Sequence, residues 1–343
     1  MSAKERIYTA FNRQVPDRVP VMLIAYSHGA HLIGKEVGAL RDFDSALASL
    51  MALYEHYKAD LITPSFGCKY WLYGDLDIEL QLPEDGYDSV AKPYFETLED
   101  IETKPLPDPR DSSSLLHNYI RLVEAACEQA GDQVVISAYG GSALGRACDL
   151  VGVDNLMRWF IRKPELAELV IQRTAEWTLE IARASLDAGA QVLGLTDPAA
   201  GGSMISTRYF KHFAQPVLTW MVKEIKAYKD VPIYLHICGH VEDRLDLMVE
   251  TGVDAFSLDQ LVSLQMAKET VGDQVCLIGN VDPVAALLQG EPETVLEEAR
   301  ACIRDAGKDG GFILAPGCGV PPRTPQENLR MLKKAVEIDG WYG

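Results

Sequence analysis

The stretch Val231-Pro232-Ile233-Tyr234-Leu235-His236 is almost entirely apolar and runs directly into Ile237-Cys238-Gly239-His240. Such continuous apolarity is typical of a parallel β-strand that is covered on both faces, because a solvent-exposed face would require alternate polar residues. The glycine just beyond indicates that the strand ends there. The stretch therefore predicts an inner strand that carries a histidine and a cysteine at its carboxyl end.

Eight runs of this kind recur along the chain, and they are separated by segments with the 3.6-residue apolar spacing of amphipathic helices. The runs are Val19–Ala25, Asp60–Thr63, Val134–Ala138, Gln191–Thr196, Val231–His236, Ala255–Leu258, Val275–Ile278 and Phe312–Ala315. Eight strand–helix units predict an α/β fold of the closed (β/α)8 TIM barrel type. A doubly wound open sheet is the alternative, and the count of eight disfavours it.

A chain of 343 residues is long enough for one barrel of about 250 residues with insertions. We therefore expect a single domain over 1–343. The segment 65–113 is too long for a simple connection, and we interpret it as an insertion after the second strand. It contains aromatic, alternating and proline-rich stretches in turn, namely Tyr70–Tyr73, Ile78–Leu82 and Pro105–Pro109. The alternation predicts a β-hairpin, with its aromatic tip either over the barrel mouth or packed on the barrel flank.

The composition is acidic, with 50 Asp and Glu against 32 Lys and Arg and a formal net charge of −18. Because basic surfaces supply the energy of nucleic-acid binding, this balance argues against a nucleic-acid partner. The seven cysteines are scattered and odd in number, which together with the lack of a signal-peptide pattern predicts a reducing, cytoplasmic location. No apolar stretch approaches the roughly 18 residues of a membrane span. The oligomeric state is left open, and a homo-oligomer is compatible with the sequence.

Three residues form the strongest candidate site. His236 and Cys238 end the fifth predicted strand, and Cys318, within Pro316-Gly317-Cys318-Gly319, ends the eighth. The carboxyl ends of barrel strands meet where barrel enzymes keep their active sites. One imidazole and two thiolates are the ligands that zinc prefers when sulfur is available. Three protein ligands leave one position of a tetrahedral zinc open, which favours catalysis over a structural role.

The sulfur content of this ligand set indicates the kind of chemistry. Two thiolates leave zinc with little residual positive charge, so such a zinc is poor at generating hydroxide. It is suited to binding a substrate thiol, removing its proton and presenting the thiolate as a nucleophile. Hydrolytic zinc sites favour histidine and carboxylate ligands instead. The ligand set therefore favours alkyl transfer to sulfur.

Four motifs extend this interpretation. They are Leu235-His236-Ile237-Cys238-Gly239, Thr251-Gly252-Val253-Asp254, Ile278-Gly279-Asn280-Val281-Asp282-Pro283-Val284, and Leu314-Ala315-Pro316-Gly317-Cys318-Gly319 followed by Thr324-Pro325. They resemble the corrinoid:coenzyme M methyltransferases, the methyltransferase branch of the uroporphyrinogen decarboxylase superfamily. The resemblance covers most of the chain and is strongest from about residue 192 onward.

The resemblance implies a (β/α)8 barrel with zinc bound by His236, Cys238 and Cys318. It also implies that a methyl group moves from a methyl-Co(III) corrinoid, carried by a small partner protein, to a zinc-bound thiol. Coenzyme M is the acceptor that it suggests, which would place the reaction in one-carbon metabolism and methanogenesis. The sulfonate of coenzyme M would need a cation near the barrel mouth, for which Arg146, Arg208 and Arg323 are the candidates.

Asp259 ends the sixth predicted strand, next round the barrel from His236. Cobalamin-independent methionine synthases are similar here, with a carboxylate one strand after a His-x-Cys pair. This similarity implies that Asp259 is the weak fourth ligand that an incoming thiol displaces, or a group that supports that position. A solvated loop aspartate is the alternative.

Further polar residues lie at or just beyond predicted strand ends. They are Asp197, predicted to take part in catalysis, and His28, Tyr139, Asn280 and Arg323, predicted to contact the substrate. The alternative for each is loop capping, because Asp and Asn readily bond their own backbone in such turns.

Other functions remain open. Uroporphyrinogen decarboxylation is disfavoured, because the arginine-rich segment that holds substrate carboxylates should follow Pro20-Val21, where the chain has Ile24-Ala25-Tyr26-Ser27-His28-Gly29-Ala30-His31. The protein could instead belong to a demethylase system and move methyl from a methylated small molecule to a corrinoid protein. A non-catalytic zinc-binding barrel is a further alternative.

Overall fold

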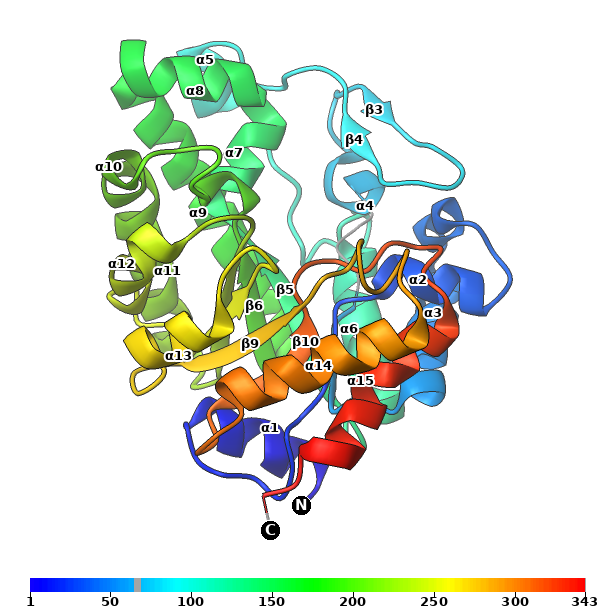
Figure 1. Ribbon diagram of the computed structural model, residues 1–343. Helices are drawn as coiled ribbons and strands as arrows, with labels where there is room; N and C mark the ends of the chain where they lie inside the picture. The colour runs from blue at the N-terminus through cyan, green and yellow to red at the C-terminus, as the bar shows by residue number, and fades with distance from the viewer. Residues whose placement is uncertain (65–68, 343) are drawn as a thin grey trace.

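A computed structural model describes residues 1–64 and 69–342, and eight parallel strands form its centre (Figure 1). The strands are β1 (Met22–Leu23), β2 (Leu61–Ile62), β5 (Val135–Gly141), β6 (Val192–Thr196), β7 (Ile233–Ile237), β8 (Ala255–Leu258), β9 (Cys276–Val281) and β10 (Phe312–Pro316). Each overlaps one of the eight predicted runs. Each strand pairs with the next in this order.

The sheet closes on itself. Val21, just before β1, forms a parallel bridge with Leu314 of β10, and the Leu314 N–H donates to the Pro20 carbonyl over 2.9 Å. The predicted (β/α)8 barrel is confirmed, and the open sheet is wrong. The register places Thr196, His236 and Ser257 side by side on β6, β7 and β8.

Helices surround the barrel (Figure 1). The α-helices outside the 65–113 segment are α1 (Ala3–Phe11), α2 (Tyr26–Leu32), α3 (Phe43–Tyr57), α6 (His117–Ala130), α7 (Ala143–Val151), α8 (Val153–Arg162), α9 (Pro164–Asp187), α10 (Thr207–Tyr209), α11 (Gln215–Tyr228), α12 (Leu245–Val249), α13 (Leu264–Val271), α14 (Pro292–Ala306) and α15 (Gln326–Asp339). Short 3-10 segments are η1 (Val37–Arg41), η2 (Pro198–Ala200) and η4 (Glu242–Arg244), and η3 (Phe210–Ala214) is a π-helical turn. Side chains cap several helix starts, such as Ser142 at α7 and Ser206 at α10.

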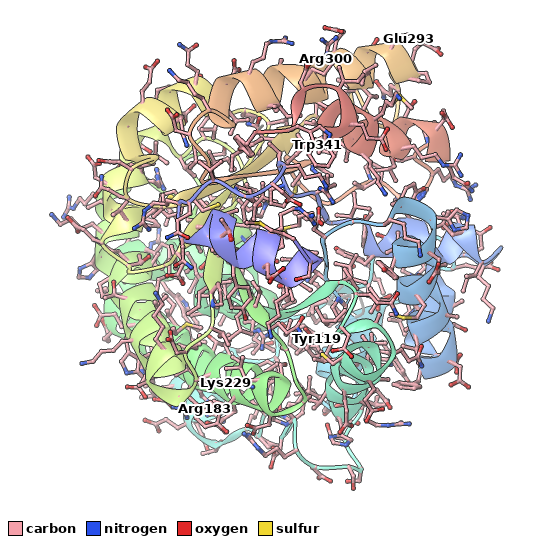
Figure 2. The ribbon with its side chains drawn as sticks, turned by 90° about the horizontal axis from the view of Figure 1, so that it is seen from below. Tyr119, Arg183, Lys229, Glu293, Arg300 and Trp341 are labelled. Atoms are coloured by element: carbon pink, nitrogen blue, oxygen red, sulfur yellow. The ribbon has the colours of Figure 1, made fainter. Side chains whose placement is uncertain are left out.

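Helix α1 covers the amino-terminal end of the barrel, as the view from below shows (Figure 2). Its Ile7, Ala10 and Phe11 are buried against inward-facing residues of the strands, such as Met22 and Ile313. Ser2 caps the helix together with Glu5 in a reciprocal capping box. One end of the barrel is therefore sealed by apolar packing, and the strand carboxyl ends are left for chemistry.

The segment between β2 and β5 carries α4 (Lys69–Tyr73), an antiparallel pair of strands β3 (Leu80–Gln81) and β4 (Ser89–Val90), and α5 (Leu98–Thr103). The aromatic stretch 70–73 forms α4 and not the hairpin tip, so that detail of the prediction is wrong. Trp71 is buried against α3, and its Nε1 donates to the Arg41 carbonyl over 2.8 Å. The residue of the hairpin that reaches the barrel mouth is Tyr87, just before β4.

Candidate metal centre

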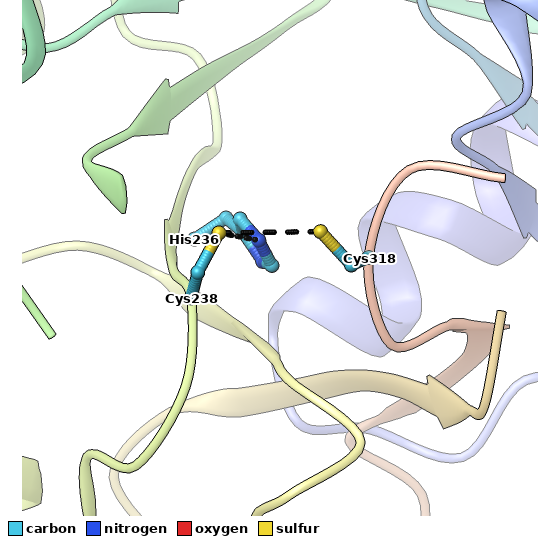
Figure 3. A group of neighbouring side chains, drawn as sticks. All are labelled: His236, Cys238 and Cys318. Atoms are coloured by element: carbon cyan, nitrogen blue, oxygen red, sulfur yellow. Dashed lines mark hydrogen bonds between the residues drawn. The ribbon is translucent and has the colours of Figure 1, made fainter. Parts of the chain in front are cut away.

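The two sulfur atoms and the imidazole converge at the barrel mouth (Figure 3). His236 lies on β7, Cys238 just beyond that strand, and Cys318 just beyond β10. The Cys238 Sγ lies 3.3 Å from the His236 Nε2 and 3.9 Å from the Cys318 Sγ. A tetrahedral zinc would separate two sulfur ligands by about 3.8 Å and a sulfur from a nitrogen by about 3.5 Å. The three ligand atoms all lie within 4.8 Å of one another, so the group fits zinc.

Ser257 on β8 fixes the orientation of the imidazole. The His236 Nδ1 lies 3.0 Å from the Ser257 carbonyl oxygen and 3.2 Å from its Oγ. A carbonyl oxygen can only accept, so Nδ1 carries the hydrogen and Nε2 keeps its lone pair for a metal. No sequence motif pointed to this serine, although its place beside His236 in the register follows once β7 and β8 are paired.

The protonation of the three groups is coupled. The hydrogen bond from Cys238, helped by His236, lowers the pKa of the Cys318 thiol to about 4. The same hydrogen bond, together with burial, raises the pKa of Cys238. Burial opposes a charge on His236, but the neighbouring Cys318 raises the pKa of the imidazole. These shifts favour a thiolate at Cys318, and binding of a divalent metal would displace the protons that remain on the group.

The backbone around Cys238 is held by two contacts. Asp259 Oδ2 accepts the Gly239 N–H over 2.8 Å. On the opposite side the loop after β6 packs so closely that a Cβ on Gly201 would lie 2.2 Å from the Cys238 carbonyl oxygen. Only glycine fits at position 201, so this residue sets how near the two loops approach.

A cavity of about 590 Å³ opens onto the three ligand residues. Its remaining walls are apolar and aromatic, formed by Ile24, Tyr26, Thr63, Pro64, Tyr87, Tyr139, Thr196, Pro198, Tyr234 and Gly319. Burial raises the pKa of Tyr26 and Tyr139, so both phenols keep their protons and can donate hydrogen bonds. None of these described lining residues is lysine or arginine.

Of the residues predicted to contact the substrate, one lines the cavity and two lie away from it. Tyr139 lines the cavity beside the metal ligands. His28 is buried away from it, with its ring nitrogens 2.7 Å from the Tyr57 hydroxyl and 3.0 Å from the Pro322 carbonyl. Arg323 is 66% exposed and pairs with Glu36 and Asp85. Neither His28 nor Arg323 is brought to the metal ligands.

Three further predicted residues lie at the carboxyl ends of β6, β8 and β9. Asn280 donates from Nδ2 to the carbonyls of Asp259 and Val262, over 3.0 and 2.7 Å. Besides holding Gly239, Asp259 accepts the Leu261 N–H at Oδ1 over 3.0 Å, and it stands outside the three-ligand group. Asp197 is 1% exposed, and burial raises the pKa of its carboxyl to about 7. Its neighbours Thr196 and Pro198 line the cavity, whereas Asp197 lies behind them.

The URO-D family model, which describes uroporphyrinogen decarboxylase, matches residues 2–338. The chain belongs to the uroporphyrinogen decarboxylase family. Within it, the chain is 27% identical to methylcobamide:CoM methyltransferase MtaA of Methanosarcina barkeri, over 97% of this chain and 96% of that protein. It is 28% identical to methylcobamide:CoM methyltransferase MtbA of Methanosarcina acetivorans, over 97% of each. It is also 26% identical to uroporphyrinogen decarboxylase of Alkalilimnicola ehrlichii, over 97% and 93%.

Among solved structures, this family member superposes on a methyltransferase from Methanosarcina mazei with a TM-score of 0.88 and 24% identity, over 98% of each chain. That likeness supports the barrel fold. The predicted resemblance to the corrinoid:coenzyme M methyltransferases is confirmed, and so is the expectation of a methyltransferase enzyme. In the described part of the chain, no helix has the length and apolarity to cross a membrane.

Proposed function

We propose that the protein is a zinc-dependent methyltransferase that takes a methyl group from a corrinoid on a small partner protein and gives it to a thiol. The observation that carries this proposal is the convergence of two cysteines and one histidine, at zinc-like separations, on the floor of an open cavity. The family relatives named methylcobamide:CoM methyltransferases support both the corrinoid donor and a thiol acceptor related to coenzyme M.

The residues of the chain have separable tasks in this reaction. His236, Cys238 and Cys318 would hold the zinc, which when bound keeps a substrate thiol deprotonated near neutral pH. Ser257 holds the imidazole with its Nδ1 protonated, and Asp259 holds the loop that carries Cys238. The apolar cavity walls exclude water from the reacting sulfur, which makes a thiolate a stronger nucleophile.

The electrons balance in a simple displacement. The sulfur lone pair forms the new bond to the methyl carbon while the cobalt–carbon bond breaks, and the cobalt keeps that electron pair and leaves as Co(I). The corrinoid partner would present its methyl group at the barrel mouth, where the cavity opens beside the three ligand residues. In-line approach of donor and acceptor is what such positioning achieves.

Decarboxylation is the competing function, because family relatives include uroporphyrinogen decarboxylases. A substrate with many carboxylates requires cationic side chains around it. The described lining of the cavity contains none, and three of its members are sulfur and imidazole ligands. This lining favours thiol methylation. The demethylase alternative has no comparable observation in its favour.

The test is to load the protein with zinc and follow the absorbance of methylcobalamin, or of a methylated corrinoid protein, with and without added thiols. We expect thiol-dependent loss of the methyl–cobalt species. Cys318→Ser should reduce both the zinc content and the rate at least tenfold, whereas Cys127→Ser, on helix α6, should change neither. If protein with one zinc per chain consumes neither methyl donor in the presence of any thiol, the proposal is overturned.

A further inference from the structure

A groove of about 740 Å³ lies outside the barrel, between α8 and the segment 207–213 that follows β6. Its floor is aromatic. The ring of Phe160 stacks on that of Phe213 with centres 4.2 Å apart, and on that of Tyr209 with centres 5.7 Å apart. These stacked rings join α8 to the second segment, so the groove has its shape before any partner arrives.

The groove is a basic surface on an acidic protein. The segments that line it, 160–164 and 207–213, contain four arginine and lysine residues and no aspartate or glutamate, although the whole chain has a formal net charge of −18. All four are exposed, and within the described residues none of them forms an ion pair. They are Arg162, Lys163, Arg208 and Lys211. Beside them, His212 lies 3.1 Å from Glu168. The unpaired charges therefore fit an acidic partner.

The groove also offers apolar surface. Ile161 lines it and is 71% exposed. Arginine, aromatic rings and an apolar side chain are the residue types enriched at the centres of protein–protein interfaces. A nucleic acid fits less well, because a chain with so much negative charge would repel an extended phosphate backbone. The combination favours an acidic protein surface as the occupant.

The groove lies beside the barrel mouth. Pro198 lines the cavity that opens onto the three ligand residues, and Thr207, further along the same loop, lines the groove. Helices α8 and α10 lie away from the end of the barrel that α1 covers (Figure 1). Arg208, a candidate for binding the sulfonate of coenzyme M, lines the groove and is not among the lining residues of that cavity.

We propose that this groove is the docking site for an acidic surface of the protein that carries the corrinoid. The inference rests on the proposed function, which requires such a partner. A cavity of about 590 Å³ holds only about twenty waters at about 30 Å³ each, which is too little for a corrin ring with its side chains. The corrinoid must therefore stay on its carrier at the mouth, and the carrier must be held by a surface outside the cavity. Opposite charges would steer it there.

The test compares two methyl donors for the zinc-loaded full chain, with 2-mercaptoethanesulfonate as the thiol. One donor is free methylcobalamin. The other is a methylated corrinoid protein, chosen from a panel as the one from which the wild type takes methyl fastest. Loss of the methyl–cobalt absorbance gives kcat and KM for each donor at low and high salt.

The variant that combines Arg162→Glu with Lys211→Glu reverses two charges of the groove. We expect it to raise the KM for the corrinoid protein at least about tenfold in about 0.01 M salt and less than about threefold in about 1 M salt, because the screening length falls from about 30 to about 3 Å. Its rate with free methylcobalamin should stay within about twofold of the wild type, since only binding of the carrier is changed.

Ile161→Ser tests the apolar part of the groove without a change of charge. It should raise the KM for the corrinoid protein about five- to tenfold at both salt concentrations, because burial of apolar surface is not screened. The matched control combines Lys4→Glu with Lys308→Glu. It produces the same net charge through exposed residues at the amino-terminal end of the barrel, on α1 and just before β10, and should leave this KM within about threefold.

An unchanged KM in the groove variant, or an equal rise in the control, would overturn the inference. So would a wild type that consumes free methylcobalamin but takes methyl from no corrinoid protein of the panel, although thiol methylation would then stand. Consumption of neither donor would overturn the proposed function, and the inference with it. Analytical ultracentrifugation covers the remaining occupant. A wild-type dimer that the groove variant dissociates would assign the groove to a second copy of the chain and overturn the inference.

Discussion

Asp259, just beyond β8, holds the loop that carries one residue of the candidate metal site. Its two carboxylate oxygens accept the N–H groups of Gly239 and Leu261, and the first of these directly follows Cys238. The carboxylate therefore sets where one sulfur ligand stands. Supporting groups of this kind are often worth one or two orders of magnitude in metal affinity.

Asp259→Ala should accordingly lower the zinc affinity about 10- to 100-fold, because the Gly239 N–H loses its acceptor and the Cys238 loop is released. Asp259→Asn keeps one acceptor oxygen and should lose less. Competition with a chromogenic chelator measures both, and Asp273→Ala, at an exposed position, is the control. Unchanged zinc affinity in Asp259→Ala would show that this contact does not position the ligand.

The buried imidazole of His28 makes the stability of the fold depend on pH. Burial lowers the pKa of this imidazole to about 4, although its Nδ1 contact with the Pro322 carbonyl opposes the shift. An unfolded histidine titrates near 6.5, so between about pH 6.5 and 4 the unfolded chain binds a proton that the folded chain rejects. The contribution of His28 to stability is complete above this window and is lost as the pH falls through it.

We therefore expect the free energy of unfolding to fall by roughly 3 kcal/mol more in the wild type than in His28→Gln between pH 7 and pH 4. Urea denaturation at several pH values in this range measures the difference between the two proteins. Parallel curves for wild type and variant would contradict the assignment of the proton to this residue.

At the scale of elements, the two ends of the barrel have different roles. The amino-terminal end contributes stability, and the carboxyl-terminal end carries the candidate site. Asp60, just before β2, joins α1 to the start of β1 by accepting from Arg6 Nη1 at 2.6 Å, from Arg18 at 2.8 and 2.9 Å, and from the Val21 N–H at 2.9 Å. It is 3% exposed. Asp60 and the groups it binds lie at the amino-terminal end of the strands, whereas barrel enzymes keep their active sites at the carboxyl-terminal end.

Asp60→Ala should cost about 3–5 kcal/mol of unfolding free energy, because it leaves two guanidinium groups and a backbone N–H without this acceptor. The thiol affinity of the folded, zinc-loaded fraction should stay the same. Urea denaturation measures the loss. Glu327→Ala is the comparison, because the exposed ion pair between Glu327 and Arg330 should contribute only about 0–1 kcal/mol. A loss of thiol binding without a loss of stability would contradict this division.

At the scale of the whole molecule, we expect the barrel to fold without the proposed zinc and to bind the metal only afterwards. The barrel buries continuous apolar clusters inside and outside its strands, and the three ligands stand on strand ends that this packing already fixes. A chain of this kind differs from a zinc finger, in which the metal supplies the folding energy.

Removing zinc with a chelator should therefore leave the far-ultraviolet circular dichroism unchanged and lower the melting temperature by only a few degrees. Zinc present at about 1,000 times its dissociation constant stabilises the fold by about 4 kcal/mol. Thiol binding should disappear in the same sample and return when zinc is restored. Unfolding at room temperature upon chelation would show instead that the metal is structural.

The eight strands could be predicted because their signal is local. A parallel strand covered on both faces needs a continuous apolar run, and each of the eight runs contains or overlaps a strand of the barrel. The convergence of His236, Cys238 and Cys318 could be predicted for the same reason, since residues at strand ends meet at one end of a barrel. Strand bounds were less exact, as at 19–25, where only Met22 and Leu23 form β1.

The tertiary structure alone decided which strand-end residues face the reaction. Asn280, Asp259 and Tyr139 have similar places in the sequence, yet two brace loops and the third lines the cavity. The direction of a side chain beyond a strand end depends on loops that arrive from distant parts of the chain. Tyr87, for example, reaches the cavity from the β3–β4 hairpin. The sequence thus determined the barrel and the convergence of His236, Cys238 and Cys318 at one end of it, whereas packing between distant segments determined the shape and lining of the cavity beside them.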